Sequence, residues 1–205
     1  MPPSFSPGAP DLPESLGTAA GILLAAGAGT RMGTPKGLLR TPDGTAWVSR
    51  AVAALAVGGC SPIFAVTGAA AEHVQALVPA LAEIVVAADW SEGMAASLRA
   101  GLRAAQQRAP AAVAVIITLV DTPGVTGEAV ARLQRLAGPA VLARAAYHGV
   151  PGHPVLIGRE HWAGVIATAT GDAGARGYLS AHDVVLVESA DIASGEDIDT
   201  PEGLG

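Results

Sequence analysis

Short apolar runs alternate along the chain with longer segments of helical periodicity. The runs are rich in Val, Ile, Leu and Ala, and their near-continuous apolarity predicts strands that are buried on both faces. The longer segments repeat apolar positions every three or four residues and have Gly or Pro at their borders. This alternation predicts an α/β fold in which helices cover a mostly parallel sheet. The expected strands span residues 21–26, 62–68, 83–89, 112–121, 139–145 and 184–189, and the expected crossover helices span residues 46–58, 70–80, 93–107 and 126–137.

Two segments do not follow this alternation. Residues 149–162, "GVPGHPVLIGREHW", mix Gly, Pro and His in a way typical of a functional loop. The N-terminal segment contains prolines and acids but neither the basic nor the apolar region of a signal peptide. We therefore expect a flexible tail over residues 1–19 and, because no internal repeat is visible, a single domain over residues 20–205.

The composition points to a compact protein that binds a small ligand. Half of the 205 residues are hydrophobic, 15% are charged, and the net charge is -6. A chain of this charge has no basic field to attract nucleic acid or an anionic membrane. No apolar run approaches the roughly 20 residues of a membrane-spanning helix. Cys60 is the single cysteine, which rules out an intrachain disulfide and fits a reducing cytoplasm.

A glycine-rich loop follows the first expected strand in "ILLAAGAGTRMGTPKGLL", residues 22–39. Right-handed connections place this loop at the carboxyl edge of the sheet, where open α/β folds bind ligands. Its glycines allow backbone N–H groups to approach phosphate oxygens, and Arg31 and Lys36 can neutralise the remaining charge. Taken alone, the loop is equally compatible with a tight strand-to-helix turn.

Two familiar phosphate-binding patterns do not fit the loop. The dinucleotide pattern G-x-G-x-x-G requires glycine at position 32, where this chain has Met32. The pattern G-x-x-x-x-G-K-[ST] fails because Lys36 follows Pro35 and precedes Gly37. The spacing of the glycines and of Lys36 therefore disfavours both phosphate-binding patterns.

The stretch "LLAAGAGTRMGTPKGLL" resembles the signature L-x-A-G-G/A-x-x-x-R-M-G-x-x-K of the nucleotidyltransferase superfamily. The resemblance extends from about residue 20 to the C-terminus and is strongest to the MobA/MocA-like molybdenum cofactor nucleotidyltransferases. It implies a Rossmann-like three-layer fold and a loop that wraps the triphosphate of a nucleotide, with Arg31 and Lys36 as catalytic phosphate ligands. The nucleotide-binding positions that it implies are Leu24, Ala25, Ala26, Gly27, Ala28, Gly29, Arg31, Lys36 and Gly68.

A second stretch, "DWSEGMAASLRAGL" at residues 89–102, is similar to the family segment N/D-W-x-x-G-M-x-x-S-L-x-x-G-L. Gly93 and the small residues after it would let a helix N-terminus come close to a base or a phosphate. The resemblance implies that Ser97 contacts the nucleotide. On the residues alone, a plain amphipathic helix is an equal alternative.

Asp121 ends the most apolar expected strand in "LVDTPGV", residues 119–125. A carboxylate there is costly unless a cation or hydrogen-bond donors satisfy it, so it is either a Mg²⁺ ligand or a turn or helix cap. The resemblance implies a catalytic Mg²⁺ ligand. The C-terminal "DIDTPEGL" resembles the closing family motif D-x-D-T-P-E-D-L and implies Asp199 as second metal ligand, with Asp197 as the alternate; Gly203 replaces the usual acid.

Two further motifs imply the acceptor side of the site. "GHPVLI" (152–157) resembles a G-x-P segment and "GDAGAR" (171–176) resembles G-D-x-G-A-R. They assign His153, Asp172 and Arg176 to acceptor binding. On the residues alone, an equal alternative is that His153 is a structural histidine in a turn. Residues 171–176 could likewise form a surface loop that leads to a short helix.

The resemblance implies a Mg²⁺-dependent enzyme that transfers a nucleoside monophosphate from an NTP to the phosphate of molybdopterin and releases pyrophosphate. It also implies a preference for CTP over GTP, since Ala26 adds a methyl group where the purine-using branch of the family has glycine. A transient contact with a molybdoenzyme or its chaperone is also expected. The alternatives are another phosphorylated acceptor (a sugar phosphate, methylerythritol phosphate or phospholactate) or a nucleotide-binding protein that delivers cofactor without turnover.

Overall fold

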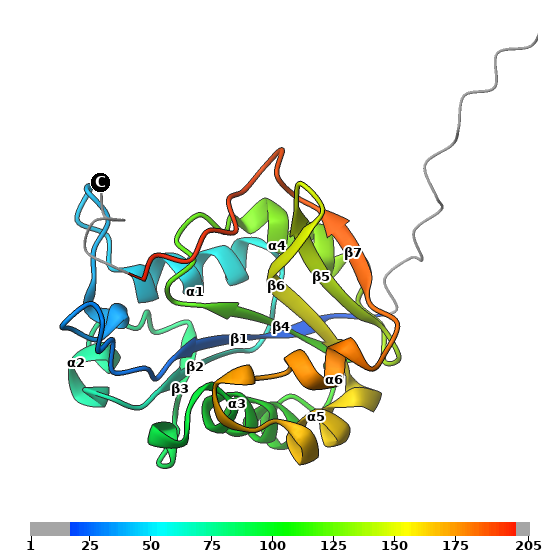
Figure 1. Cartoon of the computed structure of the whole chain (residues 1–205), viewed down its shortest axis with the longest axis horizontal. Coiled ribbons are helices and arrows are strands. Elements are labelled where there is room, and N and C mark those ends of the chain that lie inside the picture. The colour runs from blue at the N-terminus through cyan, green and yellow to red at the C-terminus, as the bar shows by residue number, and fades with distance from the viewer. Residues whose placement is uncertain (1–16, 200–205) are drawn as a thin grey trace, which may run out of the picture.

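The computed structural model describes residues 17–199 and contains a seven-stranded sheet with helices on both faces (Figure 1). The strand order is β3-β2-β1-β4-β6-β5-β7. The strands are β1 (Ala19–Ala25), β2 (Ile63–Thr67), β3 (Ala82–Val86), β4 (Ala114–Leu119), β5 (Leu142–Tyr147), β6 (Val150–Gly158) and β7 (Val185–Glu188). All sheet pairings in the described residues are parallel except those of β6 with β4 and β5. The expected α/β architecture with a mostly parallel sheet is confirmed.

The helices form two layers that bury the two faces of the sheet (Figure 1). One layer holds α1 and α4, whose apolar residues pack with one face of the central strands, and the other holds α3, α5 and α6. The α-helices are α1 (Trp47–Val57), α2 (Ala71–Gln75), α3 (Met94–Arg108), α4 (Gly127–Gln134), α5 (Trp162–Thr168) and α6 (Arg176–Ser180). None of the helices described is long and apolar enough to cross a membrane.

The central strands are apolar on both faces because both are covered. Every residue of β1 and of β4 is buried, and successive side chains enter the two opposite cores. Helix α3 approaches the sheet closely at Gly101, where a Cβ atom would lie 2.8 Å from Ile22 Cγ2. The continuous apolar runs in the sequence are thus explained by burial on both sides.

The segment 149–162 was expected to be a loop, and this expectation is wrong. Residues 150–158 form strand β6, which lies between β4 and β5. Its prolines are tolerated because pairing with β4 begins only at Val155, so Pro151 and Pro154 leave no gap in that ladder. The prediction that this segment has a functional role still has a structural basis. Strand β6 is antiparallel to β4 and so brings His153 to the carboxyl edge of β4.

The other expected elements agree with the structure within a few residues, except for the helix expected over 70–80. That helix, α2, ends at Gln75. Pro79 lacks the N–H that would bond to the Gln75 carbonyl, and it disfavours helical geometry at Val78, which accounts for the early end. Most of the expected tail (residues 1–16) and the end of the closing motif (200–205) lie outside the described residues.

Candidate active site

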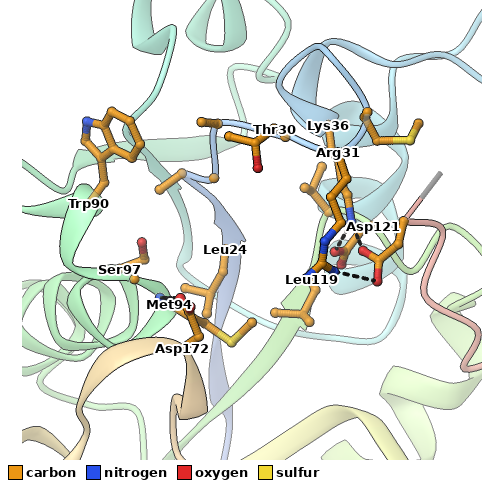
Figure 2. Close-up of a pocket in the computed structure, with 18 of the residues that line it drawn as sticks. Leu24, Thr30, Arg31, Lys36, Trp90, Met94, Ser97, Leu119, Asp121 and Asp172 are labelled. Atoms are coloured by element: carbon orange, nitrogen blue, oxygen red, sulfur yellow. Dashed lines mark hydrogen bonds and ion pairs between the residues drawn. The ribbon is translucent and has the colours of Figure 1, made fainter. Parts of the chain in front are cut away.

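A cavity of about 470 Å³ opens at the carboxyl edge of β1 and β4 (Figure 2). Most of its wall comes from the glycine-rich loop after β1, the segment at the start of α3 and the residues that follow β4, and Asp172 and Asp199 complete it. Its lining comprises Leu24, Ala26–Met32, Lys36, Trp90, Ser91, Gly93, Met94, Ser97, Leu119–Asp121, Asp172 and Asp199. The location agrees with the expectation that ligands bind where parallel strands end.

The glycine-rich loop closes on itself at Gly29. This residue has a φ of +61°, and a Cβ atom there would lie only 1.9 Å from the Thr34 carbonyl oxygen. A side chain at Gly29 therefore cannot be accommodated without opening the loop. The closed loop leads into the short 3₁₀ helix Lys36–Leu38, which starts at Lys36 beside the cavity.

Lys36 joins the loop to two carboxylates from distant parts of the chain. Its ammonium group donates a 2.8 Å hydrogen bond to Asp121 Oδ2 and another to Asp199 Oδ1 (Figure 2). Burial by itself lowers the pKa of Lys36, but the hydrogen bonds and charges of the two aspartates outweigh it and raise this pKa above its ordinary value. Arg31 Nη1 lies 3.9 Å from Asp199 Oδ2. The predicted basic and acidic residues are thus one cluster.

The C-terminal segment is held against β4, and this brings Asp199 to the site. The Ile198 N–H donates to the Asp121 carbonyl oxygen at 2.9 Å, and the Ser194 N–H donates to the Gly124 carbonyl oxygen at 3.2 Å. Further along, Arg132 of α4 forms two hydrogen bonds to the Asp191 carboxylate. These contacts explain how a residue near the end of the chain reaches Lys36.

Asp121 has the properties of a metal ligand. Its Oδ1 atom is buried and has no hydrogen-bond partner among the described residues. A buried carboxylate oxygen without a donor is costly, and a hard cation such as Mg²⁺ prefers oxygen ligands. No group of three or more His, Cys, Asp or Glu side chains among residues 17–199 is arranged to hold a metal. Asp121 and Asp199 therefore fit a cation that takes its other ligands from substrate phosphates and water.

Trp90 and Ser97 lie across the cavity from Lys36 and Asp121 (Figure 2). Both come from the segment that includes the start of α3. Arg99 secures this segment: it donates hydrogen bonds to Asp89, Glu92 and the Ala169 carbonyl oxygen. The cavity thus has a charged end formed by the loop and the aspartates, and a less polar end beside Trp90.

Two of the residues expected to contact the nucleotide do not line the cavity. Ala25 points into the core beneath α1, because side chains alternate along β1 and its neighbours Leu24 and Ala26 take the cavity positions. Gly68 lies behind Trp90, where a Cβ atom would come 2.6 Å from Trp90 Cβ and Cγ. For Gly68, the structure shows a requirement for close packing and no direct access to the cavity.

The three expected acceptor residues meet in a second cavity of about 140 Å³ that adjoins the first. The two cavities share Leu24, Met94, Leu119 and Asp172 in their linings. His153, Asp172 and Arg176 line the second cavity together with Arg144 and Asp197. Burial and the nearby charge of Arg144 lower the pKa of His153 to about 4, so its ring is neutral at neutral pH.

The two candidates for the second metal ligand are placed differently. Asp199 faces the first cavity and bonds Lys36, whereas Asp197 lines the second cavity. Burial and the charges of Asp121 and Asp199 raise the pKa of Asp197 above its ordinary value. Of the two, Asp199 has the contacts expected of a ligand beside Asp121.

Sequence reasoning missed Trp90 and Arg144 as site residues. Trp90 belongs to the "DWSEGM" stretch, but its indole carries no charge that would single it out. Arg144 stands in the middle of an apolar strand, "LARAAY", and a charge in such a run was the signal that could have identified it.

Comparison with known proteins defines the family to which this fold belongs. The chain belongs to the family of proteins with a MobA-like NTP transferase domain, whose model matches residues 21–185. It is 39% identical over 197 residues to the nicotine blue oxidoreductase of Paenarthrobacter nicotinovorans, a match that covers 90% of this chain and 93% of the relative.

Solved structures support the same assignment of fold. A homologue of Mycobacterium tuberculosis Rv0371c from Mycobacterium sp. strain JC1 superposes with a TM-score of 0.77 at 29% identity, over 90% of this chain and 92% of the other. The Rv0371c complex with manganese from Mycobacterium tuberculosis H37Rv superposes with a TM-score of 0.69 at 26% identity, over 84% and 88% of the two chains. A homologous structure thus contains a divalent metal.

Proposed function

We propose that this protein transfers CMP from CTP to the phosphate of molybdopterin, with Mg²⁺ as cofactor and pyrophosphate as second product. The observation that carries the proposal is the contact of Lys36 with both Asp121 and Asp199. This contact joins a phosphate-binding loop to a pair of carboxylates beside a second, arginine-lined cavity. The family membership supports the nucleotide, and the identity of the acceptor rests on the resemblance of the sequence motifs.

In the proposed reaction, an oxygen of the acceptor phosphate attacks the α-phosphorus of CTP. The bond from this phosphorus to the bridging oxygen breaks, and pyrophosphate leaves with the electron pair. The second pKa of a phosphate monoester is about 6, so the nucleophile is already ionised at neutral pH and needs no general base. The protein's task is to align the two substrates and to stabilise charge on the phosphate oxygens.

Arg31, Lys36 and the N–H groups of the glycine-rich loop would supply that stabilisation. Asp121 and Asp199 would hold the metal ion, which when bound neutralises charge on the triphosphate and on the departing pyrophosphate. Lys36 bonds to both aspartates in the structure. Lys36 bonds only the Oδ2 atom of Asp121, so the Oδ1 atom of the same carboxylate, which has no partner within residues 17–199, would be available to the metal.

The less polar end of the cavity would receive the base. Trp90 offers an aromatic surface there, and Ala26, which is 3% exposed, adds a methyl group to the cavity wall near it. A smaller space favours the pyrimidine over the purine, which is the steric argument for CTP.

A pyrophosphate-release assay tests this function. Each of the four NTPs is combined with Mg²⁺ and one acceptor: molybdopterin, a sugar phosphate, methylerythritol phosphate or phospholactate. Release with CTP and molybdopterin supports the proposal. Release with a different acceptor replaces the substrate but keeps the reaction class. Binding of CTP without release for any acceptor would instead favour a protein that delivers cofactor without turnover.

One observation favours a second candidate. The relative that is 39% identical is named an oxidoreductase of nicotine blue. An activity of that class requires an electron donor, so the test is whether this protein oxidises NADH or NADPH in the presence of a reducible dye. Oxidation that survives Lys36→Ala and Asp121→Ala would show a reaction independent of the proposed phosphate chemistry.

A further inference from the structure

Arg144 occupies an unusual position for a guanidinium. It lies in the middle of β5, opposite Val155 of β6 and Leu186 of β7, and both residues next to it in sequence are buried. Side-chain alternation puts Arg144 on the face of the sheet that Leu142 shares, away from Ala143 and Ala145. A charge placed within a sheet in this way is costly unless something compensates it.

The described residues provide little compensation. The Nε atom of Arg144 donates to the Gly152 carbonyl oxygen at a long 3.3 Å. Within residues 17–199, no carboxylate lies within ion-pair distance of Arg144 or Arg176. Burial and the charge of Arg176 both lower the pKa of Arg144, so the second arginine adds repulsion. Two like charges thus line the same cavity, and neither forms an ion pair within residues 17–199.

The acidic residues of this cavity are engaged elsewhere. Asp172 Oδ1 accepts a hydrogen bond from the Met94 N–H at 3.4 Å, at the start of α3. Asp197 lines the second cavity two residues before Asp199, which faces the first cavity and bonds Lys36. His153 is neutral at neutral pH and adds no charge of its own. The cavity therefore has an acidic end toward Asp121 and a cationic end formed by β5 and α6.

We propose that Arg144 and Arg176 together bind the phosphate group of the acceptor, so that the second cavity selects phosphate monoesters. The proposal rests on the proposed function for the identity of the reaction. Guanidinium groups bind phosphate oxygens through two parallel hydrogen bonds, and two of them can neutralise a dianion. Neutralisation also reduces the repulsion that the acceptor phosphate meets as it approaches the triphosphate in the adjoining cavity.

Binding of inorganic phosphate, measured by isothermal titration calorimetry, tests this site without turnover. The full chain is first saturated with Mg²⁺ and α,β-methylene-CTP, which fill the first cavity. We expect Arg144→Gln and Arg176→Gln each to weaken phosphate binding about tenfold or more, because a charge-assisted hydrogen bond is lost. Arg144→Lys keeps the charge but loses the planar fork, so we expect an intermediate loss.

Arg103→Gln is the matched control, since it removes one positive charge from the exposed side of α3, outside both cavities. Unchanged phosphate binding in Arg144→Gln and Arg176→Gln, or equal weakening in Arg103→Gln, would overturn the proposal. Acetate bound as tightly as phosphate would overturn the selection for phosphate. Thermal melting of each variant, followed by circular dichroism, distinguishes loss of phosphate binding from loss of the fold. Because Arg176 is exposed, its substitution does not disturb the sheet.

The two proposals fail in different ways. If no acceptor yields pyrophosphate, the proposed function fails. Titration of inorganic phosphate without nucleotide still tests the arginine site, because the phosphate affinities of Arg144→Gln and Arg31→Gln can be compared. If an acceptor is turned over, we expect Arg144→Gln to raise its KM about tenfold and to leave the KM for CTP unchanged. A change in the KM for CTP alone would contradict the assignment of Arg144 to the acceptor.

Discussion

Lys36 Nζ lies 2.8 Å from Asp121 Oδ2, although the two residues are 85 positions apart in the chain. The pair links the loop after β1 to the residue that follows β4, and these strands are neighbours in the sheet. The parallel pairing of β1 and β4 ends at Leu24 and Leu119, so the sheet itself brings both segments to one edge. The contact is therefore a direct consequence of the strand order.

Loss of either member of this pair should abolish most of the activity. We expect Lys36→Ala and Asp121→Ala to reduce pyrophosphate release about a hundredfold or more, since each removes a charge aimed at phosphate or metal. Asp183→Ala, an exposed acid outside both cavities, is the control and should retain normal turnover. Near-normal rates in either variant would remove that residue from the mechanism, provided that circular dichroism shows a native fold.

The same contact predicts a window of pH in which Lys36 stabilises the fold. Its pKa in the folded protein is raised above 10.5, so its contribution is complete below pH 10.5 and is lost as the pH rises through the folded value. The pKa of Asp199 is lowered from 3.8 by its hydrogen bond with Lys36, so that contribution is lost as the pH falls below 3.8.

Thermal melting of the wild type and of Lys36→Met across the pH range measures this window. The difference between the two proteins should be largest between about pH 4 and pH 10.5 and should shrink on both sides. A difference that stays constant up to pH 12 would mean that Lys36 acts through its aliphatic stem and that its charge is unimportant.

Ala26→Gly should shift the preference for the base. Removal of one methyl group from the cavity wall enlarges the space for a purine, and a single methyl group is worth roughly 10- to 200-fold in discrimination. We expect the ratio of kcat/KM for GTP to that for CTP to rise about tenfold. If the wild type already uses GTP faster than CTP with molybdopterin, the steric argument fails at the outset, and the substitution is expected to have no effect.

Gly93→Ala should disturb the wall that the two cavities share. Gly93 has a φ of +105°, and a Cβ atom there would lie 2.5 Å from Asp172 Oδ1 and 2.7 Å from the Gly171 carbonyl carbon. Strain at such a position costs about 1–3 kcal/mol, and relief of the clash displaces Asp172, which lines both cavities. We expect a lower melting temperature and higher KM values for both substrates.

Gly177→Ala is the matched control for this substitution. It lies in α6, and a Cβ atom there would meet nothing within 4 Å, so the added methyl group should leave stability equal or slightly higher. If the two variants melt at the same temperature, the backbone of Gly93 is not under the constraint described.

Much of this site could be predicted from the sequence because its residues stand at the ends of strongly apolar strands. The loop follows β1 and Asp121 follows β4. Parallel strands end at the same edge of a sheet, so the two segments lie close together although they are far apart in the sequence. β6 could not be predicted in the same way, since Pro151 and Pro154 argue against a strand and only the neighbouring strands explain why they are tolerated. The partners of Arg144 could not be predicted either, because they depend on the order of strands across the sheet.

Strand β6 runs antiparallel to its neighbours β4 and β5, and its residues line the second cavity but not the first. The first cavity, which we propose binds the nucleotide, is lined by residues within the first 121 positions of the chain apart from Asp172 and Asp199. The cationic wall of the second cavity comes from Arg144 of β5 and Arg176 of α6, and β6 adds His153 and Val155 to the lining. No residue of the β5–β6 hairpin lines the first cavity, so sequence changes there would reshape the space proposed for the acceptor and leave the lining of the first cavity unchanged. The β5–β6 hairpin and the short helix α6 are therefore the parts of this chain in which substitutions would change the proposed choice of acceptor.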